Sequence, residues 1–271
     1  MAMASSTSDP GTVEPLNRDQ LMTALNAAGV NWHDITLLDV TGSTNSDLVA
    51  RAADGEAATG SVIAADSQTS GRGRLGREWE SEAGTTLSFS VLLEAPAAAT
   101  HLLPLVVALA VVRVVAVGET TNVELKWPND LLIEGRKAAG ILAEAAPAGA
   151  VVGCGINVSI PEDRLPVPEA TSLAINGIDI ERTDLLARVL IEIFAGYDRL
   201  VEAGFSPEGS GLLADFRRRC ATLGREVRVE LPDQTSLTGR AVDVDDQGRL
   251  VLETADGQQT LSVGDVIHLR H

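Results

Sequence analysis

The most informative segment for the architecture of this chain is residues 123–158, VELKWPNDLLIEGRKAAGILAEAAPAGAVVGCGINV. Short apolar runs suited to β-strands alternate there with turn sequences such as Pro128-Asn129-Asp130 and Glu134-Gly135-Arg136. Connections this short join antiparallel neighbours, because a parallel pair needs a crossover of about a dozen residues or more. We therefore expect an antiparallel meander with strands at residues 123–126, 131–133, 137–144 and 151–158.

The sequence on either side of this meander alternates between helix and strand patterns. Asn17 can cap a helix that ends at Gly29, and Thr183 can cap a long helix that ends at Glu202. These elements predict an α+β fold with a mixed, largely antiparallel sheet flanked by helices. The other expected strands are residues 35–40, 61–65 and 86–93, and the other expected helices are residues 46–53, 102–117 and 212–220.

The pattern changes abruptly at Gly224. Short alternating strands follow, separated by turn sequences such as Asp246-Gln247-Gly248 and Asp256-Gly257. This spacing is typical of a small β-barrel of about fifty residues. We expect a disordered leader at residues 1–15, a main domain at 16–221 and the barrel at 222–271.

The composition excludes several classes of protein. With 271 residues, 45% of them hydrophobic, the chain can bury a full core. Its formal net charge of -17 disfavours a surface that binds nucleic acid. The single helix expected before Thr41 leaves no room for a helix-turn-helix module. We therefore expect no nucleic-acid partner and no DNA-binding domain.

The sequence also disfavours secretion and membrane insertion. Residues 1–15 lack the positive start and apolar core of a signal peptide. The apolar run 102–117 contains Pro104 and Arg113 and is shorter than the ~20 residues that span a bilayer, so we interpret it as a buried helix. These features predict a cytoplasmic protein with no membrane partner.

The cysteines and histidines do not form a recognisable metal or disulfide pattern. Cys154 and Cys220 are far apart, and none of the four histidines lies near them at metal-ligand spacing. Neither a disulfide framework nor a structural metal is expected. Cys154 follows the apolar residues Val151 and Val152, so we interpret it as a small buried hydrophobic residue without chemistry.

The strongest local signal is the loop GRGRLGR at residues 71–77. Glycine lets the backbone approach a ligand closely, and the guanidinium groups of Arg72, Arg74 and Arg77 match phosphate oxygens. The segment is neither a P-loop nor a dinucleotide fingerprint, because no Gly-Lys-Ser/Thr follows and no third glycine opens a helix. We expect a phosphate-binding loop; a flexible, solvated linker is the alternative.

Three further motifs carry chemistry. KWPND at residues 126–130 is either a binding turn or an ordinary turn with a core tryptophan. GRKAAGIL at residues 135–142 places Lys137 on an apolar strand, where desolvation is costly unless an anion meets the ammonium group. GCGINV at residues 153–158 puts glycines inside a strand, which commonly marks the close approach of a ligand. Together the motifs indicate an anionic ligand.

These motifs, together with TGSTN at residues 41–45 and Gln68, resemble those of the biotin protein ligases in order and spacing. The resemblance is strong from Leu38 to Val158, weaker up to Cys220, and architectural in the C-terminal barrel. It implies a class II synthetase-like catalytic domain for biotin and ATP, followed by an SH3-like barrel. The chain resembles the monofunctional members, which lack the N-terminal DNA-binding domain of the members that are also repressors.

The resemblance implies a two-step reaction. The biotin carboxylate would attack the α-phosphorus of ATP to form biotinyl-5'-AMP. A lysine of a biotin carboxyl carrier domain, from an acyl-CoA carboxylase or pyruvate carboxylase, would then displace AMP. Lys137, Arg72, Arg74, Arg77 and Mg²⁺ would neutralise the charge, and the closed loop would exclude water. A monomer or weak homodimer is expected.

The same resemblance assigns residues to each substrate. Asp130 is a candidate for the metal or for orienting a lysine, although Mg²⁺ would bind mainly through the phosphates. Trp127 could pack in the core or stack on adenine, and packing is favoured. The residues implied for biotin are Ser43, Thr44, Asn45, Gln68, Gly71, Arg72, Lys137, Gly140, Ile141 and Gly155, and those implied for ATP are Arg72, Arg74, Arg77, Trp79, Asn129, Asp130, Lys137 and Asn157.

Two other functions fit parts of the pattern. A lipoate- or octanoate-type acyl ligase has a related fold, but the GRGRLGR and KWPND motifs resemble biotin ligases. A non-catalytic regulator that binds biotin or a nucleotide is disfavoured, because Lys137 and three loop arginines equip the site for chemistry on anions.

Overall fold

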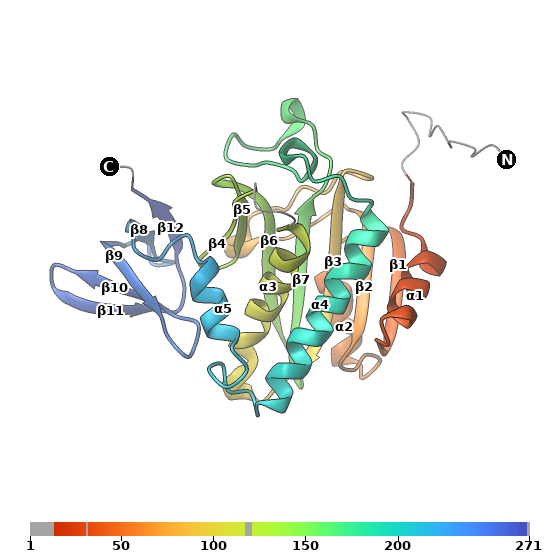
Figure 1. Cartoon of the computed structure of the whole chain (residues 1–271), viewed down its shortest axis with the longest axis horizontal. Helices are drawn as coiled ribbons and strands as arrows, with labels where there is room; N and C mark the ends of the chain where they lie inside the picture. Colours follow the sequence, from red (N-terminus) through yellow and green to blue (C-terminus); the bar gives the residue numbers. More distant parts are fainter. Residues whose placement is uncertain (1–13, 31, 117–120, 270–271) are drawn as a thin grey trace.

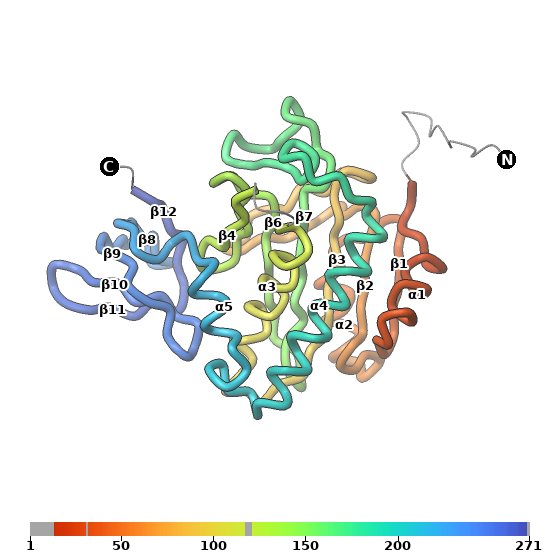
Figure 2. The backbone as a smooth tube through the Cα atoms, viewed as in Figure 1, coloured from red at the N-terminus to blue at the C-terminus, as the bar shows by residue number. Residues whose placement is uncertain are grey.

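The computed structural model describes residues 14–30, 32–116 and 121–269. A seven-stranded sheet carries helices on both faces, and a five-stranded C-terminal sheet lies beside it (Figure 1). The two ends of the described chain lie on opposite sides of the molecule (Figure 2). Of the expected leader, residues 1–13 lie outside the described residues. Leu16, the first described apolar residue of the main domain, donates its backbone N–H to Asp66 Oδ1 over 3.2 Å.

The large sheet has the strand order β1-β2-β3-β7-β6-β5-β4. β1 and β2 pair in parallel, and the other described neighbours pair antiparallel, so the expectation of a mixed, largely antiparallel sheet is confirmed. The strands are β1 (Asp34–Thr41), β2 (Ser61–Gln68), β3 (Thr86–Glu94), β4 (Val123–Lys126), β5 (Asp130–Ile133), β6 (Arg136–Ala146) and β7 (Gly149–Asn157).

The expected meander forms the strands β4 to β7. The turn between β5 and β6 contains Glu134 and Gly135, both with positive φ, as a tight hairpin turn of this hand requires. The register places Gly140 of β6 opposite Asp130 of β5 and opposite Gly155 of β7. The meander therefore brings three of the sequence motifs together at one place in the sheet.

Helices cover the two faces of the large sheet unequally. The face opposite to the site described below packs against α3 and α4, and α1 and α5 lie beside these helices (Figure 1). The other face carries α2, whose Leu48 packs against Ile63, Leu92 and Val151. The helices are α1 (Arg18–Ala27), α2 (Thr44–Ala53), α3 (Leu103–Val115), α4 (Arg182–Glu202) and α5 (Leu212–Arg219).

The apolar helix expected at residues 102–117 is the 3-10 turn η2 (Ala97–Leu102) followed by α3. Together they are long and apolar enough to cross a membrane. Nearly every residue of α3 is buried, however, against α4 and the strands of the sheet. The interpretation as a buried core helix is thus the one that the packing supports.

The expected N-cap of the long helix is wrong by two residues. The cap is Glu181, whose carboxylate accepts the backbone N–H groups of Thr183 and Asp184 over 2.9 and 3.0 Å. Thr183 lies inside the helix, and its hydroxyl accepts the backbone N–H of Asn17 over 3.1 Å. The helix start is thus connected to the beginning of α1, a contact between distant segments that no local pattern encodes.

A buried ion pair links α4 to the large sheet. Arg182 and Asp66 lie 2.6 Å apart, and their side chains are only 6% and 9% exposed. Arg182 also donates to the backbone carbonyl of Glu14. Separating the two side chains would leave an uncompensated buried charge, which is unfavourable. The pair therefore holds the end of β2, the start of α4 and the segment at Glu14 together.

The C-terminal segment forms an antiparallel sheet of order β11-β10-β9-β8-β12, in agreement with the expected small β-structure. Alternate residues such as Val227, Val229 and Leu252 are fully buried and join the main core. Arg217 of α5 pairs with Asp243 of this sheet, with 2.6 Å between Nε and Oδ1. The strands are β8 (Glu226–Glu230), β9 (Ser236–Val244), β10 (Leu250–Thr254), β11 (Gly257–Leu261) and β12 (Asp265–His268).

Candidate active site

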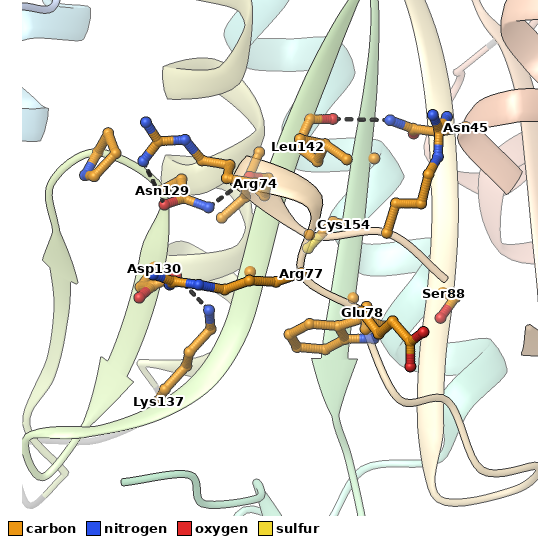
Figure 3. A pocket seen from close by; sticks show the side chains of 18 of the residues that line it. Asn45, Arg74, Arg77, Glu78, Ser88, Asn129, Asp130, Lys137, Leu142 and Cys154 are labelled. Atoms are coloured by element: carbon orange, nitrogen blue, oxygen red, sulfur yellow. Dashed lines mark hydrogen bonds and ion pairs between the residues drawn. The ribbon is translucent and has the colours of Figure 1, made fainter. Parts of the chain in front are cut away.

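A cavity of about 290 Å³ opens on the α2 face of the large sheet. Its walls come from the N-terminus of α2, the loop at residues 71–79 and the strands β5 to β7. The C-terminal sheet completes one wall with Glu230, Asp265, Val266 and Ile267. In Figure 3, Arg74, Arg77 and Lys137 gather near Asn129 and Asp130, whereas Asn45 lies on the opposite side.

One end of the cavity is lined by neutral polar groups that hold one another in place. Ser43 caps α2, and Gln68 Oε1 accepts the backbone N–H and the hydroxyl of Thr44 over 2.9 and 3.2 Å. Ser90 donates over 2.6 Å to Asn45, whose amide donates to the Leu142 carbonyl over 3.1 Å. Because Ser43, Thr44, Asn45 and Ser90 are buried and Gln68 is held by Thr44, this end can recognise a small polar, uncharged group with few hydrogen bonds.

The floor of the cavity is a pair of glycines beneath a tryptophan. Gly140 and Gly155 are register partners, and the ring of Trp79 lies against both. A Cβ atom on Gly155 would lie 2.3 Å from Trp79 Cε2, whereas a Cβ atom on Gly140 would lie 3.2 Å from Cζ3. The Nε1 atom of Trp79 is buried and has no hydrogen-bond acceptor among the described residues. The glycines therefore create the space that the ring occupies.

The other end of the cavity is cationic. Lys137 Nζ lies 2.6 Å from Asp130 Oδ1 and 5.7 Å from the centre of the Trp79 ring, within the range of a cation-π contact. From the sequence, the Lys137 ammonium group was expected to need an anion to offset its desolvation. In the structure, Asp130 is that anion. Burial lowers the pKa values of Lys126 and Arg74, and nearby carboxylates such as Asp130 partly oppose that effect.

The arginine loop is folded on itself between Gly71 and Trp79. The N–H of Trp79 donates to the Gly71 carbonyl over 2.9 Å, and the N–H of Gly73 donates to the Arg77 carbonyl over 2.7 Å. Leu75 at its tip has a φ of 56°, in the left-handed region that residues other than glycine rarely adopt. These contacts favour an ordered loop over the flexible, solvated linker that was the alternative from the sequence.

Each loop arginine has an acceptor from another element. Arg72 donates to Glu144 over 2.7 Å, and the same carboxylate oxygen accepts from Asn45 over 2.8 Å. Arg74 donates to Asn129 Oδ1 over 3.3 Å, and Arg77 forms an ion pair with Asp265. The guanidinium groups therefore converge on the cavity while held by protein groups.

Most residues expected at the site line this cavity, with two exceptions. Gly71 lines the adjoining groove outside the loop. Asn157 is buried away from the cavity, where its amide donates to the Thr171 carbonyl over 2.9 Å, so the structure gives no support to a role in ATP binding. The expected residues that do line the cavity are Ser43, Thr44, Asn45, Gln68, Arg72, Arg74, Arg77, Trp79, Asn129, Asp130, Lys137, Gly140, Ile141 and Gly155.

The expected site omitted several residues that the fold brings to the cavity. Lys126 belongs to the KWPND motif, so its charge beside that motif could have identified it as a residue of the site. Glu144 lines the adjoining groove instead, where it accepts from Arg72 and Asn45, and it could have been suspected as an acidic residue on an apolar strand. Glu230 and Asp265 gave no local signal, because they reach the cavity from the C-terminal sheet.

The structure favours core packing for Trp127. The side chain is only 2% exposed, and its Nε1 donates to the Gly248 carbonyl of the C-terminal segment over 2.9 Å. Cys154 is also buried, and burial raises the pKa of its thiol to about 12, so its interpretation as a buried residue without chemistry is consistent with the structure.

The described residues hold no group of three or more His, Cys, Asp or Glu side chains placed to bind a metal ion. Asp130, the candidate metal residue, is paired with Lys137 instead. The other cavity carboxylates named above, Asp265 and Glu230, are paired with Arg77 and Arg228, so the described residues suit a magnesium ion that arrives with a nucleotide better than one held by the protein alone.

Comparison with known proteins identifies the family. The model of the biotin/lipoate A/B protein ligase family matches residues 37–160, and the model of the biotin protein ligase C-terminal domain matches residues 222–269. A biotin-[acetyl-CoA-carboxylase] ligase of Mycobacterium tuberculosis is 40% identical over 94% of this chain and 97% of its own length. One of Paracoccus denitrificans is 33% identical over 85% of this chain and 98% of its own length.

A solved structure shows the same fold. The biotin protein ligase of Aquifex aeolicus, in complex with biotin and ATP, superposes with a TM-score of 0.70 at 28% identity. The match covers 89% of this chain and 100% of that chain. Sequence motifs, cavity and comparisons agree, and this chain belongs to the biotin protein ligase family.

Proposed function

We propose that this chain is an ATP-dependent biotin protein ligase. It forms biotinyl-5'-AMP from biotin and ATP and then transfers biotin to a lysine of a carrier domain. The observation that carries the proposal is a single cavity with a neutral hydrogen-bonding end and a cationic end. The relatives named above are biotin ligases, and the Aquifex enzyme was solved with both substrates.

The neutral end suits the head group of biotin. A ureido ring is polar but uncharged, and Ser43, Thr44, Asn45 and Gln68 offer fixed hydrogen-bonding groups for it. The apolar part of the ligand would lie beside Ile141 and the Trp79 ring, which Gly140 and Gly155 support from below. The carboxylate at the far end of biotin would then reach Lys137 at the cationic end.

The cationic end suits the first reaction. A carboxylate oxygen of biotin attacks the α-phosphorus, the bond from that phosphorus to the bridging oxygen breaks, and pyrophosphate leaves. Both reactants are anionic, so their repulsion must be offset. Lys137, Arg74 and Arg77 supply positive charge at this end, Arg72 of the same loop lies closer to Asn45, and positioning with electrostatics provides the catalysis.

The second reaction needs no nucleophile from the enzyme. The neutral amine of a carrier lysine attacks the carbonyl carbon of the mixed anhydride, and AMP leaves with the bonding electron pair. The high pKa of the buried Cys154 thiol fits a site in which no enzyme thiolate takes part. The arginine loop over the cavity would keep water from hydrolysing the adenylate.

Magnesium would bind mainly through the phosphates, with Asp130 as the protein group placed to contact it or to orient Lys137. The ion would supply further neutralisation of the phosphate charge when bound. Trp79 and Asn129 are proposed to contact the nucleotide, because both line the cationic end. We assign no such role to Asn157.

The carrier is proposed to be the biotin carboxyl carrier domain of an acyl-CoA carboxylase, since the relatives bear that specificity in their names. A pyruvate carboxylase is the other candidate. We further propose a catalytic domain at residues 16–221 and a C-terminal domain from residue 222, a division supported by the separate sheet that begins at Glu226. A cytoplasmic location, no membrane or nucleic-acid partner, and a monomer or weak homodimer complete the proposal.

The direct test offers labelled biotin or labelled lipoate to the purified protein with ATP, magnesium and a carrier domain. We expect biotin to give pyrophosphate, an adenylate and a labelled carrier. The matching family model covers lipoate ligases as well, so labelling by lipoate in place of biotin would favour that alternative. Binding of biotin without pyrophosphate release would instead indicate a non-catalytic regulator.

A further inference from the structure

The arginine loop is attached to the C-terminal sheet at two points. Arg77 forms an ion pair with Asp265, the first residue of β12. Arg74 donates to the carbonyl of Gly264 over 3.3 Å. These partners lie almost two hundred residues apart in the chain, so the contacts exist only because the C-terminal sheet closes one wall of the cavity.

The start of β12 is a firm support for these contacts. Gly264 is buried with a φ of 152°, and a Cβ atom there would lie 2.4 Å from Val229 Cγ1. The following residues pair with β8, where Asp265 lies opposite Glu230 and Val266 is buried. The Asp265 side chain is 20% exposed, whereas that of Arg77 is 66% exposed. The carboxylate is thus fixed, and the arginine is the partner that can move.

The ion pair with Asp265 occupies the guanidinium group of Arg77, which the proposed reaction needs for the triphosphate. A guanidinium group binds a carboxylate and a phosphate through the same forked donors, so it cannot serve both fully at once. Asp265 also faces the same cavity as Glu230, another carboxylate. When a triphosphate draws Arg77 away, the Asp265 carboxylate loses its ion-pair partner, whereas Glu230 keeps its own pair with Arg228 over 3.0 Å.

We propose that Asp265 is a positioning residue that holds the arginine loop over the empty cavity and releases Arg77 to the triphosphate of ATP. The C-terminal sheet thereby sets the affinity for the nucleotide. This inference rests on the proposed function, because ATP is the anion that replaces Asp265. Glu144 does not share the role, since its carboxylate also holds Asn45 at the neutral end of the cavity.

The first test measures how firmly the loop is held without ligand. Trypsin cleaves after arginine, so the rate at which fragments ending at residues 72, 74 and 77 appear, followed by mass spectrometry, reports loop opening. In the ligand-free protein we expect Asp265→Asn to raise this rate about two- to fivefold, the range for a partly exposed ion pair. Saturating biotin and ATP should protect the loop equally in the wild type and the variant.

A matched control separates loop release from a general loosening of the two sheets. Asp243→Asn also removes an ion pair between the C-terminal sheet and the rest of the chain, with Arg217, but Asp243 does not line the cavity. It should leave the cleavage rate of the loop unchanged. An equal acceleration in both variants, or none in Asp265→Asn, would overturn the proposal.

The second test measures nucleotide affinity. Asp265→Asn should lower the KM for ATP about two- to fivefold and leave the KM for biotin unchanged. In a double-mutant cycle, adding Asp265→Asn to Arg77→Gln should change the KM for ATP no further, because the aspartate acts through that arginine. A full, additive effect in the Arg77→Gln background would contradict the mechanism.

The reciprocal variant keeps the test decisive if Asp265→Asn folds poorly. Arg77→Gln breaks the same pair from the loop side, and cleavage after Arg72 and Arg74 should rise by the same factor. The tryptic result in ligand-free protein does not depend on catalysis. A wild type that forms no adenylate would refute the proposed function, whereas unchanged cleavage would refute the role of Asp265.

Discussion

Lys137 and Asp130 form an ion pair at the cationic end of the cavity, with 2.6 Å between Nζ and Oδ1. The lysine lies on β6 opposite Leu132, and the aspartate lies at the start of β5 opposite Gly140, so the ion pair runs diagonally between the two strands. The pair holds the ammonium group between the arginine loop and the floor of the cavity. In the reaction that we propose, this position lets Lys137 meet both the biotin carboxylate and the α-phosphate.

Replacing Lys137 should therefore remove adenylate formation. We expect Lys137→Ala to lower the rate of pyrophosphate release about 100- to 1000-fold, the loss typical of one preorganised charge donor in an active site. The free energy of unfolding should change by less than about 1 kcal/mol, since the ion pair is partly exposed. Asp130→Asn keeps the ammonium group of Lys137, so it should lower the rate of pyrophosphate release less than Lys137→Ala does. An unchanged rate in Lys137→Ala would exclude the lysine from the mechanism.

The two floor glycines should differ in their tolerance of a methyl group. Gly155→Ala would place Cβ inside the Trp79 ring, so the ring and its loop must move, and we expect adenylate formation to fall about tenfold or more. Gly140→Ala meets the ring at 3.2 Å and should cost less. In a Trp79→Ala background the added methyl group should have little further effect on the rate. If Gly155→Ala lowered the rate of adenylate formation equally in the wild type and in the Trp79→Ala variant, the clash would not be with the Trp79 ring.

Trp127 should matter for stability rather than for nucleotide binding. Trp127→Phe removes the hydrogen bond from Nε1 to the Gly248 carbonyl and some buried surface, so the free energy of unfolding should fall by about 1 to 3 kcal/mol. Urea denaturation would measure this loss. The KM for ATP should not change. A large increase in that KM with unaltered stability would favour stacking on adenine.

His268 should make the stability of the protein depend on pH. Burial, with smaller contributions from Lys126 and Arg225, lowers its pKa from 6.5 to about 4. Its Nε2 atom lies 3.2 Å from the hydroxyl of Thr222, which accepts the backbone N–H of Trp127 over 3.1 Å. A neutral imidazole with an unprotonated Nε2 can accept the proton of that hydroxyl, which an imidazolium cannot do.

The sign of the pH effect follows from the two protonation states. Between pH 6.5 and about 4 the unfolded chain binds a proton at His268 that the folded chain does not, so the free energy of unfolding falls as the pH falls through this window. We expect a loss of about 1 kcal/mol for this half-buried ring. Urea denaturation of the wild type and of His268→Gln at pH 7 and pH 5 would measure it. Equal pH dependence of the two proteins would contradict the assignment.

Local patterns predicted most of the secondary structure. The short turns between apolar runs fixed the antiparallel meander of β4 to β7, because such turns allow no other pairing. The 3.6-residue periodicity located α4, but its N-cap is Glu181, and Thr183 lies inside the helix, where its hydroxyl binds the backbone of Asn17. Helix ends are less well predicted by local rules than helices themselves.

The sequence by itself determined the arginine loop, the strand that carries Lys137 and the glycines that leave space above the sheet. These depend on residue type and spacing, which set backbone geometry within a few residues. Only the tertiary structure decided that Trp79 fills the space over Gly155, that Asn157 turns away from the cavity, and that Asp265 meets Arg77. Such pairings depend on how two sheets pack across long separations in the chain, and packing leaves no periodic mark on either partner.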